Sequence, residues 1–297
     1  MNLKNLKKYN FELDDYSKFN NENRKVYLFD NTNCDELLEK FYTKILSSIE
    51  TKKHLPIIRI ADGEYQFLLG KNEFNLRKPI YKLGIHILRQ FFEKIFNLQF
   101  EAKSRTYTSG VYSKDDMTSV KNKYADCLHH ISKNGIIALY TVIKPYFYTE
   151  QYLPKLFKFF KFKEIELTSS NYMPFYFIYI LLTNKKYADL YKDKNIHLIT
   201  SFNSVRKEKI EHSLNLLKPK SISWTKISRD KSLFDKVNID SISDEIDIIF
   251  IGAGVGKVNI FNQLKNKKCL IIDAGYIFET WENPQLVNER DYCKITN

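Results

Sequence analysis

A chain of 297 residues in which 43% are hydrophobic and 15% aromatic can bury a sizeable core, which excludes a disordered or low-complexity protein. The 47 lysines and arginines outnumber the 35 acidic residues, and the net charge of +12 favours an anionic partner, such as a nucleotide, an acidic lipid or a nucleic acid. The amino-terminal stretch lacks an apolar run after a basic start, and the longest apolar run, Met173 to Leu182, is too short to span a bilayer. We therefore expect a cytoplasmic protein.

The spacing of the cysteines and histidines argues against a disulfide framework and against a zinc site. The sequence contains no CxxC pair, and its histidines show no HxxxH or HExxH spacing. We expect reduced thiols, and histidines in structural or exposed positions.

The amino-terminal part predicts an arm, a helix, a strand and a second helix. Residues 1–34 are polar and weakly patterned, and we interpret them as an arm before a single α/β domain at 35–297. Apolar side chains at helical spacing predict a helix at 35–49. Pro56 to Ala61 is typical of a short buried strand, and Glu64 to Leu69 predicts the second helix.

The rest of the chain alternates between the periods of helices and strands. We expect helices at 85–96, 150–161 and 203–217 and in the segment that ends at Leu264, and strands at 135–142, 162–167, 196–200, 221–227, 247–251 and 269–273. Such alternation predicts parallel pairing and right-handed crossovers. The expected fold is α/β and Rossmann-like, a mostly parallel sheet with flanking helices; lobes at 35–194 and 195–297 are an alternative division of the domain.

A glycine-rich loop follows the strand at 247–251 and precedes a helix. Glycines let the backbone approach an anion, and the amino terminus of a helix offers free N–H donors and a partial positive charge. The loop lacks P-loop spacing, but its context favours a nucleotide or phosphate site at Gly252, Gly254 and Gly256, with Lys257 as an additional charge. The alternative is a tight turn that packs helix on strand, with a solvated lysine.

Two further strand ends carry candidate ligand groups. Asp273 ends the last expected strand, where a Rossmann-like unit often places a carboxylate against a ribose; alternatively it forms a turn before Gly275. Asn203 and Arg206 follow another strand end and are secondary candidates for nucleotide binding. Their structural alternatives are a helix cap and a surface charge.

Arg59-Ile-Ala-Asp62-Gly-Glu64 places two carboxylates at the carboxyl end of the first expected strand. Carboxylates two residues apart can present oxygens to one divalent cation that also holds a diphosphate. Alternatively, Asp62 caps the following helix and Glu64 lies favourably in its first turn.

This segment resembles the Arg-apolar-Gly-Asp-Gly-Glu signature of the GT-D type glycosyltransferases, with Ala61 in place of the usual glycine. The Gly252 loop, together with Leu270-Ile-Ile-Asp-Ala-Gly275, is similar to the carboxyl-terminal glycine loop and Asp-x-Gly strand of that family. The resemblance covers roughly residues 55 to 283 and is specific only at these two ends.

The resemblance implies a metal-dependent glycosyltransferase that moves a sugar from a nucleoside diphosphate sugar, first of all a UDP-sugar, to a surface glycan or glycoprotein acceptor. Mn²⁺ or Mg²⁺ on Asp62 and Glu64 would neutralise the departing diphosphate. Arg59 would join the glycine loop in binding the nucleotide. Just after the Asp273 strand, Glu279 is a candidate catalytic base and Trp281 a candidate platform for stacking a sugar.

Two alternatives stay open. The GxGxG loop also suits S-adenosylmethionine in a methyltransferase, although the other strands of that fold would then have to precede the loop. The basic, aromatic stretch Tyr146 to Lys163 would suit a non-catalytic module that binds RNA or membrane, or simply a core face and a solvated face.

No nucleic-acid motif accompanies that stretch, so we expect no nucleic acid partner. Lys155, Lys158 and Lys161 stand at helical spacing. We expect them to make peripheral contact with the anionic inner face of the membrane, where a lipid-linked glycan acceptor could be presented.

Overall fold

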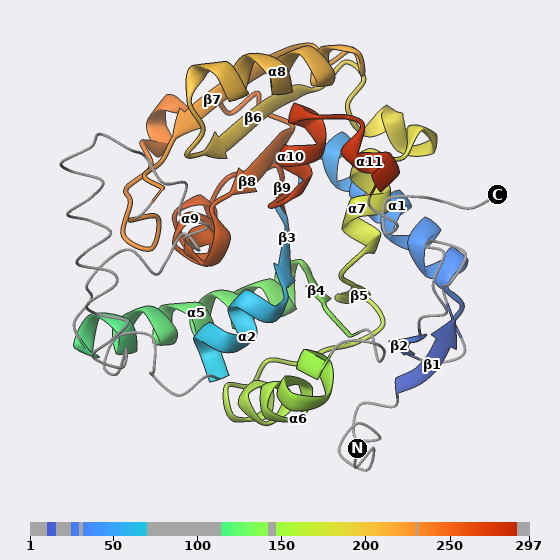
Figure 1. The fold of residues 1–297 in the computed structure, drawn as a ribbon, viewed down its shortest axis with the longest axis vertical. Coiled ribbons are helices and arrows are strands. Elements are labelled where there is room, and N and C mark those ends of the chain that lie inside the picture. Colours follow the sequence, from blue (N-terminus) through green and yellow to red (C-terminus); the bar gives the residue numbers. More distant parts are fainter. Residues whose placement is uncertain are drawn as a thin grey trace.

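The computed structural model describes residues 11–15, 25–29, 32–69, 114–141, 147–229 and 231–289. Within these residues, a parallel sheet of seven strands runs in the order β5-β4-β3-β9-β8-β6-β7 (Figure 1). The strands are β3 (Leu55–Ile60), β4 (Ile136–Leu139), β5 (Tyr172–Pro174), β6 (Asn195–Thr200), β7 (Ser221–Lys226), β8 (Ile248–Gly252) and β9 (Leu270–Asp273). The predicted α/β fold with a parallel sheet and flanking helices is confirmed.

Helices cover both faces of the sheet. They are α1 (Cys34–Glu50), α2 (Asp62–Leu69), α5 (Lys114–Asn134), α6 (Phe147–Phe162), α7 (Phe177–Thr183), α8 (Ser204–Asn215), α9 (Lys257–Leu264), α10 (Ile277–Glu282) and α11 (Leu286–Glu289). Short 3₁₀ turns lie at Lys185–Leu190, Ile239–Ser241 and Gly254–Gly256. Figure 1 shows α5 and α9 on one side of the sheet and α1 and α7 on the other.

The core follows from this layering. Strands β3, β4 and β9 are buried along their whole length, as expected of parallel strands that are covered on both faces. Their sequences are accordingly mostly apolar rather than alternating, and the charged exceptions are Arg59 in β3 and Asp273 at the end of β9. The edge strand β7 is only partly buried, which explains its mixed sequence SISWTK.

The strand order creates a switch point between β6 and β8. The connection from β6 leads to β7 on one side, and the connection from β8 leads to β9 on the other. In open α/β sheets, ligands bind in the crevice outside the carboxyl ends of such strands. In the register of the sheet, Thr200 at the end of β6 lies opposite Gly252 at the end of β8.

Part of the segment that we interpret as an amino-terminal arm forms strands. β1 (Phe11–Asp15) and β2 (Lys25–Phe29) form an antiparallel pair. Tyr172 donates a hydrogen bond through its hydroxyl to the carbonyl of Tyr27 at 2.6 Å, and its ring packs edge-on against Phe29. The apolar end of β2 is therefore part of the core.

The strand expected at 162–167 is wrong. The chain turns there, with Glu164 at a φ of 53°, and continues without strand pairing to β5. Ile165 and Leu167 are buried while Glu166 is exposed, so the side chains alternate as in a strand although the backbone is not in the sheet. The helix expected at 85–96 lies outside the described residues.

The other predicted elements match within a few residues. Observed α8 begins after Asn203, whose side chain caps it, and β4 is shorter than its predicted range. Across the described residues, none of the helices combines the length and the apolarity that a membrane span requires.

Candidate functional site

The segment with the paired carboxylates forms the junction between β3 and α2. Asp62 is the first residue of α2, and its side chain lies outside the described part of the structure. Glu64, two residues later, turns back so that its Oε2 accepts a hydrogen bond from the N–H of Ala61 at 2.9 Å. Because Tyr65 N–H donates to the carbonyl of Ala61, this contact is one half of a capping box at the start of α2.

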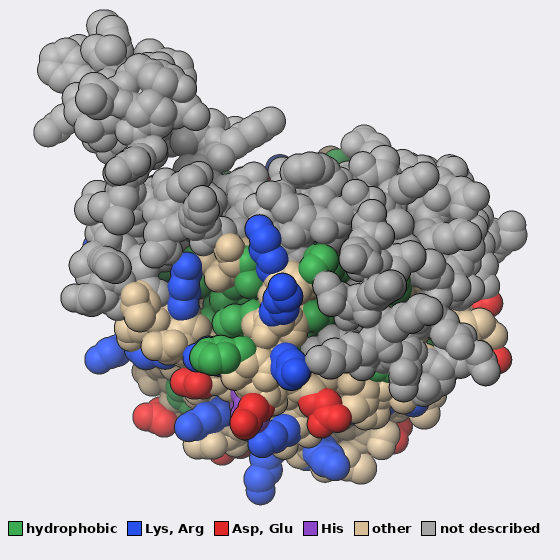
Figure 2. Space-filling view, turned by 90° about the horizontal axis from the view of Figure 1, so that it is seen from below, with side chains coloured by type: hydrophobic (Ala, Val, Ile, Leu, Met, Phe, Trp, Pro, Cys, Tyr) green, Lys and Arg blue, Asp and Glu red, His purple; other side chains and the backbone are tan. Residues whose placement is uncertain are grey.

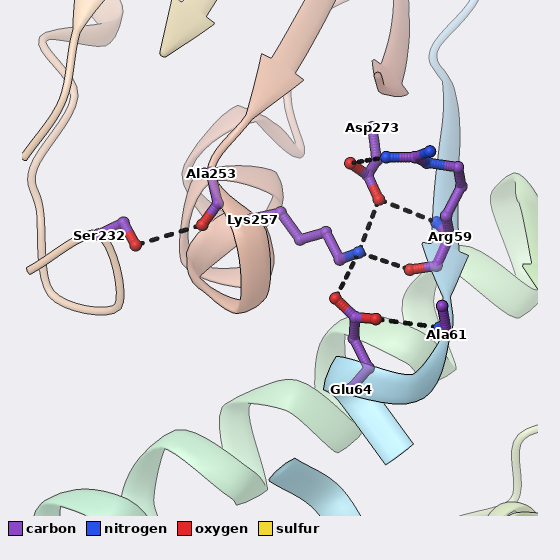
Figure 3. Close-up of polar contacts among 7 residues, drawn as sticks. All are labelled: Arg59, Ala61, Glu64, Ser232, Ala253, Lys257 and Asp273. Atoms are coloured by element: carbon purple, nitrogen blue, oxygen red, sulfur yellow. Dashed lines mark hydrogen bonds and ion pairs between the residues drawn. The ribbon is translucent and has the colours of Figure 1, made fainter. Parts of the chain in front are cut away.

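Lys257 joins this junction to the glycine loop. It is the first residue of α9, and only 3% of it is exposed. Its Nζ lies 2.8 Å from Oε1 of Glu64, 2.6 Å from Oδ2 of Asp273 and 2.6 Å from the carbonyl oxygen of Arg59 (Figure 3). The structure thus brings Arg59, Glu64, Lys257 and Asp273 into one buried cluster, which we call the ion cluster.

Arg59 binds Asp273 on the side of the ion cluster opposite Glu64 (Figure 3). Its Nη2 donates to Oδ1 of Asp273 at 3.1 Å, and its backbone N–H donates to Oδ2 at 3.3 Å. The guanidinium lies 5.1 Å from the ring centroids of Phe175 and Tyr179. Burial alone would lower the pKa of Arg59, but Asp273 and Tyr179 outweigh it and raise the pKa above its ordinary value.

Asp273 is an ion-pair partner in this structure rather than an open ligand group. It is 1% exposed, and both of its oxygens have cationic partners. Burial would raise the pKa of its carboxyl, but Arg59 and Lys257 lower it below its ordinary value. The buried Tyr124 lies in the field of this cluster, and burial together with Glu64 and Asp273 raises the pKa of its hydroxyl.

The three glycines of the loop have different structural settings. A Cβ on Gly252 would lie 2.8 Å from the ring of Phe278, and one on Gly256 would lie 2.1 Å from Oγ of Ser232. Ser232 in turn donates to the carbonyl of Ala253 at 3.2 Å (Figure 3). Packing therefore accounts for glycine at these two positions.

Gly254 differs from the other two because it is exposed and adopts a φ of 54°, a conformation that favours glycine. The loop therefore turns sharply at this exposed position. Of the three glycines, Gly254 is the one that the structure leaves open to a ligand.

The loop that follows β6 lies beside the glycine loop, because the ends of β6 and β8 are paired at Thr200 and Gly252. Asn203 accepts a hydrogen bond from the N–H of Arg206 at 3.1 Å and so caps α8. The guanidinium of Arg206 stacks 3.7 Å above the ring of Phe202 and lies 2.6 Å from a carboxylate oxygen of Glu282. Arg206 is half-buried, and its Nε donates to the same oxygen of Glu282, so this structure shows Arg206 in an ion pair rather than as an open ligand group.

Thr200 contributes a buried polar atom next to this loop. Its Oγ1 is buried and has no hydrogen-bond partner within the described residues. It lies 3.3 Å from the place that a Cβ on Gly252 would take. A buried hydroxyl at a strand end that borders the switch point is consistent with a polar ligand there.

The residues after Asp273 lie on α10. Glu279 is half-buried there. Trp281 is 5% exposed and packs against Phe250 and Phe278, with ring centroids 5.1 and 5.3 Å apart. The interpretation of Trp281 as a stacking platform is therefore wrong, because its ring belongs to the core.

Sequence reasoning missed several residues that shape the site. They are Tyr124, Phe175, Tyr179 and Ser232. None of the four belongs to a motif that the sequence analysis identified, whereas Gly275, two residues after Asp273, was visible in the Asp-x-Gly pattern. In the described ranges, no group of three or more His, Cys, Asp or Glu side chains is arranged to hold a metal ion.

The sequence matches no protein-family model and no curated protein. Its structure is similar to a selenomethionine-substituted structure of domain of unknown function 1792, with 13% identity, 85% of each chain covered and a TM-score of 0.48. It is also similar to a structure of that domain described as having a distinct glycosyltransferase fold, with 12% identity, 82% of this chain and 80% of that chain covered, and a TM-score of 0.47. Likenesses this remote do not establish a function, which has to be inferred from the residues of the site.

Proposed function

We propose that this chain is a glycosyltransferase that uses a nucleoside diphosphate sugar. The observation that carries the proposal is the contact between Lys257 and Glu64. The two segments that resemble the GT-D family lie far apart in the sequence. If both resemblances had arisen by chance, we would not expect the two segments to be in contact in the fold. This ion pair joins them at the carboxyl edge of one sheet.

The donor would bind at the switch point between β6 and β8. Its diphosphate would lie at Gly254 and the amino terminus of α9, where backbone N–H groups and the helix dipole favour an anion. Arg206, in the first turn of the helix after β6, would add a positive charge on leaving its ion pair with Glu282. A UDP-sugar is the donor that we propose first.

The reaction would couple two events. The acceptor oxygen attacks the anomeric carbon while the bond from that carbon to the diphosphate breaks, and Glu279 on α10 would take the proton of the acceptor hydroxyl. Positive charge near the diphosphate would stabilise the leaving group, and the loop would align donor and acceptor.

The divalent cation that the resemblance implies does not fit Glu64 in this structure. One oxygen of Glu64 has the ammonium of Lys257 at 2.8 Å, and the other accepts from Ala61. A divalent ion at the same oxygen would face the positive charge of Lys257 at close range. We therefore derive no step through a metal at this pair, and Mn²⁺ or Mg²⁺ enters only as a variable of the assay.

The acceptor would be a glycan, and we propose a lipid-linked one. Lys155, Lys158 and Lys161 are exposed on α6, as expected from their spacing, and Phe162 at the end of this helix is 79% exposed. Seen from the side on which α6 lies in Figure 1, the molecule shows lysine and arginine side chains next to hydrophobic ones, with acidic side chains on the same face (Figure 2). Basic residues beside an exposed aromatic ring suit an anionic membrane surface.

The test is a screen of nucleoside diphosphate sugars for hydrolysis and transfer, with and without Mn²⁺. We expect turnover with one donor class, and a loss of most of it in Asp62→Asn, because the family resemblance implies that Asp62 is a catalytic residue. The matched control is Asp240→Asn, which removes the same charge from an exposed position in the Ile239–Ser241 turn. Tight binding of S-adenosylmethionine with no response to any nucleotide sugar would instead identify a methyltransferase.

A further inference from the structure

Lys257 has an unusual environment for a lysine in the first turn of a helix. An ammonium group has three N–H donors. Each has a matching oxygen here: the carbonyl of Arg59, Oδ2 of Asp273 and Oε1 of Glu64, all within 2.8 Å of Nζ. Figure 3 shows Nζ at the centre of these oxygens. The group is coordinated on every donor and is shielded from solvent.

The charges of the ion cluster balance. Arg59 and Lys257 contribute two positive charges, and Glu64 and Asp273 contribute two negative ones. Buried charges are tolerated when they are paired and their hydrogen bonds are complete, whereas removing one partner leaves an uncompensated charge. A cation at the position of Nζ is therefore required by the two carboxylates that surround it.

The oxygens around Nζ are of the kind that a hard divalent cation takes, two carboxylates and one backbone carbonyl. We propose that the ammonium of Lys257 is the resident cation of this site, and that Glu64 is a positioning residue rather than a ligand of a divalent metal. This inference corrects the metal role that the family resemblance implies for Glu64. It concerns the site of the proposed function, but does not require sugar transfer to take place.

The arrangement gives Glu64 a definite task. Its Oε2 fixes the first turn of α2 through Ala61, and its Oε1 ties that turn to the first residue of α9. Asp62, which begins α2, is thereby held in register with the glycine loop. A divalent ion that serves the reaction would then have to be held without Glu64.

The experiment measures Mn²⁺ binding by the full chain, using the loss of the electron paramagnetic resonance signal of free Mn²⁺. The first comparison is between the wild type and Glu64→Gln. If Glu64 is not a ligand, we expect the two dissociation constants to differ by less than about tenfold, because the amide oxygen of glutamine can still accept the hydrogen bond from Ala61 that holds α2. Loss of measurable Mn²⁺ binding in Glu64→Gln, beyond the roughly hundredfold that a positioning residue can cost, would overturn the proposal.

The second comparison removes the resident cation. Lys257→Met keeps a side chain of similar length but leaves Glu64 and Asp273 without the ammonium, so we expect this variant to gain Mn²⁺ affinity by about tenfold or more. Its melting temperature should rise with Mn²⁺, and the double variant Lys257→Met/Glu64→Gln should lose the gain. Lys265→Met, an exposed lysine at the other end of α9, is the matched control for charge.

Each result decides the matter. If Lys257→Met folds only when Mn²⁺ is added, the site has accepted a divalent ion in place of the ammonium, which supports the proposal. If Lys257→Met is folded and binds Mn²⁺ no better than Lys265→Met, the oxygens are not a cation site and the proposal is wrong. Because no sugar donor is used, failure of the transferase assignment would leave this outcome unaffected.

Discussion

The guanidinium of Arg59 occupies the space that a side chain on Gly275 would need. A Cβ built on Gly275 would lie 1.7 Å from Nη2 of Arg59, and the glycine itself adopts a φ of 46°. Gly275 follows the β9 carboxylate Asp273, which holds the same guanidinium at 3.1 Å. The Asp-x-Gly pattern therefore has a physical reason: the aspartate binds the arginine and the glycine makes room for it.

Gly275→Ala should be strongly destabilising. The substitution forces a methyl group into Arg59 and places alanine in the left-handed region, and together these effects should lower the free energy of unfolding by about 2 to 4 kcal/mol. Denaturant titration monitored by circular dichroism measures the change. Gly63→Ala is the control, because nothing lies within 4 Å of its Cβ position and it should be neutral or slightly stabilising. Equal stability of Gly275→Ala and Gly63→Ala would show that Arg59 moves away without cost.

Stability should fall with acid through His197 on β6. Its Nδ1 and Nε2 hydrogen-bond the hydroxyls of Ser223 and Thr225 at 2.7 and 2.9 Å, and burial, with a smaller effect of Lys267, lowers the pKa of His197 from 6.5 to about 4. Between these values the unfolded chain binds a proton that the folded chain does not. The contribution of neutral, buried His197 to the free energy of unfolding is therefore complete above pH 6.5. About 3 kcal/mol of this contribution should be lost on going to pH 4.

The measurement is the free energy of unfolding against pH for the wild type and for His197→Gln, whose amide can keep hydrogen bonds to both hydroxyls. The two curves should converge as the pH falls from 7 to 4, because only the wild type carries this proton linkage. Parallel curves would mean that His197 titrates normally in the folded protein.

Much of the sheet was predictable because its central strands are buried on both faces. A strand such as β9, with the sequence LIID, has to be apolar except where a buried charge is paired, as Asp273 is with Arg59, and its neighbours share this property. α5 was missed although the signal was present. Its buried residues Val120, Tyr124, Leu128 and Ile131 follow helical spacing, but they are separated by polar residues that mask the periodicity.

The ion cluster could not be predicted in the same way. Sequence reasoning selected Arg59, Glu64, Lys257 and Asp273 separately, each for a ligand. Which charges meet depends on the order of the strands, and the chain places β9 between β3 and β8 only through long crossovers. No local pattern shows that Lys257 points back to Glu64 instead of outward to a phosphate.

The glycine loop can be tested at Gly254. A valine there would combine a steric block with strain, because the φ of 54° is unfavourable for a β-branched residue. Gly254→Asn is the better change, since asparagine tolerates this conformation. If the loop binds the diphosphate, Gly254→Asn should keep its stability within about 1 kcal/mol and weaken nucleoside diphosphate binding by about tenfold, measured by calorimetry. Unchanged affinity in the folded variant would remove Gly254 from the binding site.

The last prediction concerns contact between the α6 surface and a membrane. Replacing Lys155, Lys158 and Lys161 by glutamine removes three exposed charges, and at about 1 kcal/mol for each lysine near an anionic surface the affinity for phosphatidylserine vesicles should fall by about a hundredfold at low salt. The difference should shrink at high salt because of screening.

The control changes three exposed lysines at the opposite end of the molecule, near α8 in Figure 1: Lys209, Lys218 and Lys220. Phe162→Ser should weaken binding further at all salt concentrations, since insertion of an aromatic ring is not screened. An equal loss of vesicle affinity in both triple variants would mean that only the overall charge matters. Preferential binding of single-stranded RNA over the vesicles would mean that the α6 surface binds nucleic acid.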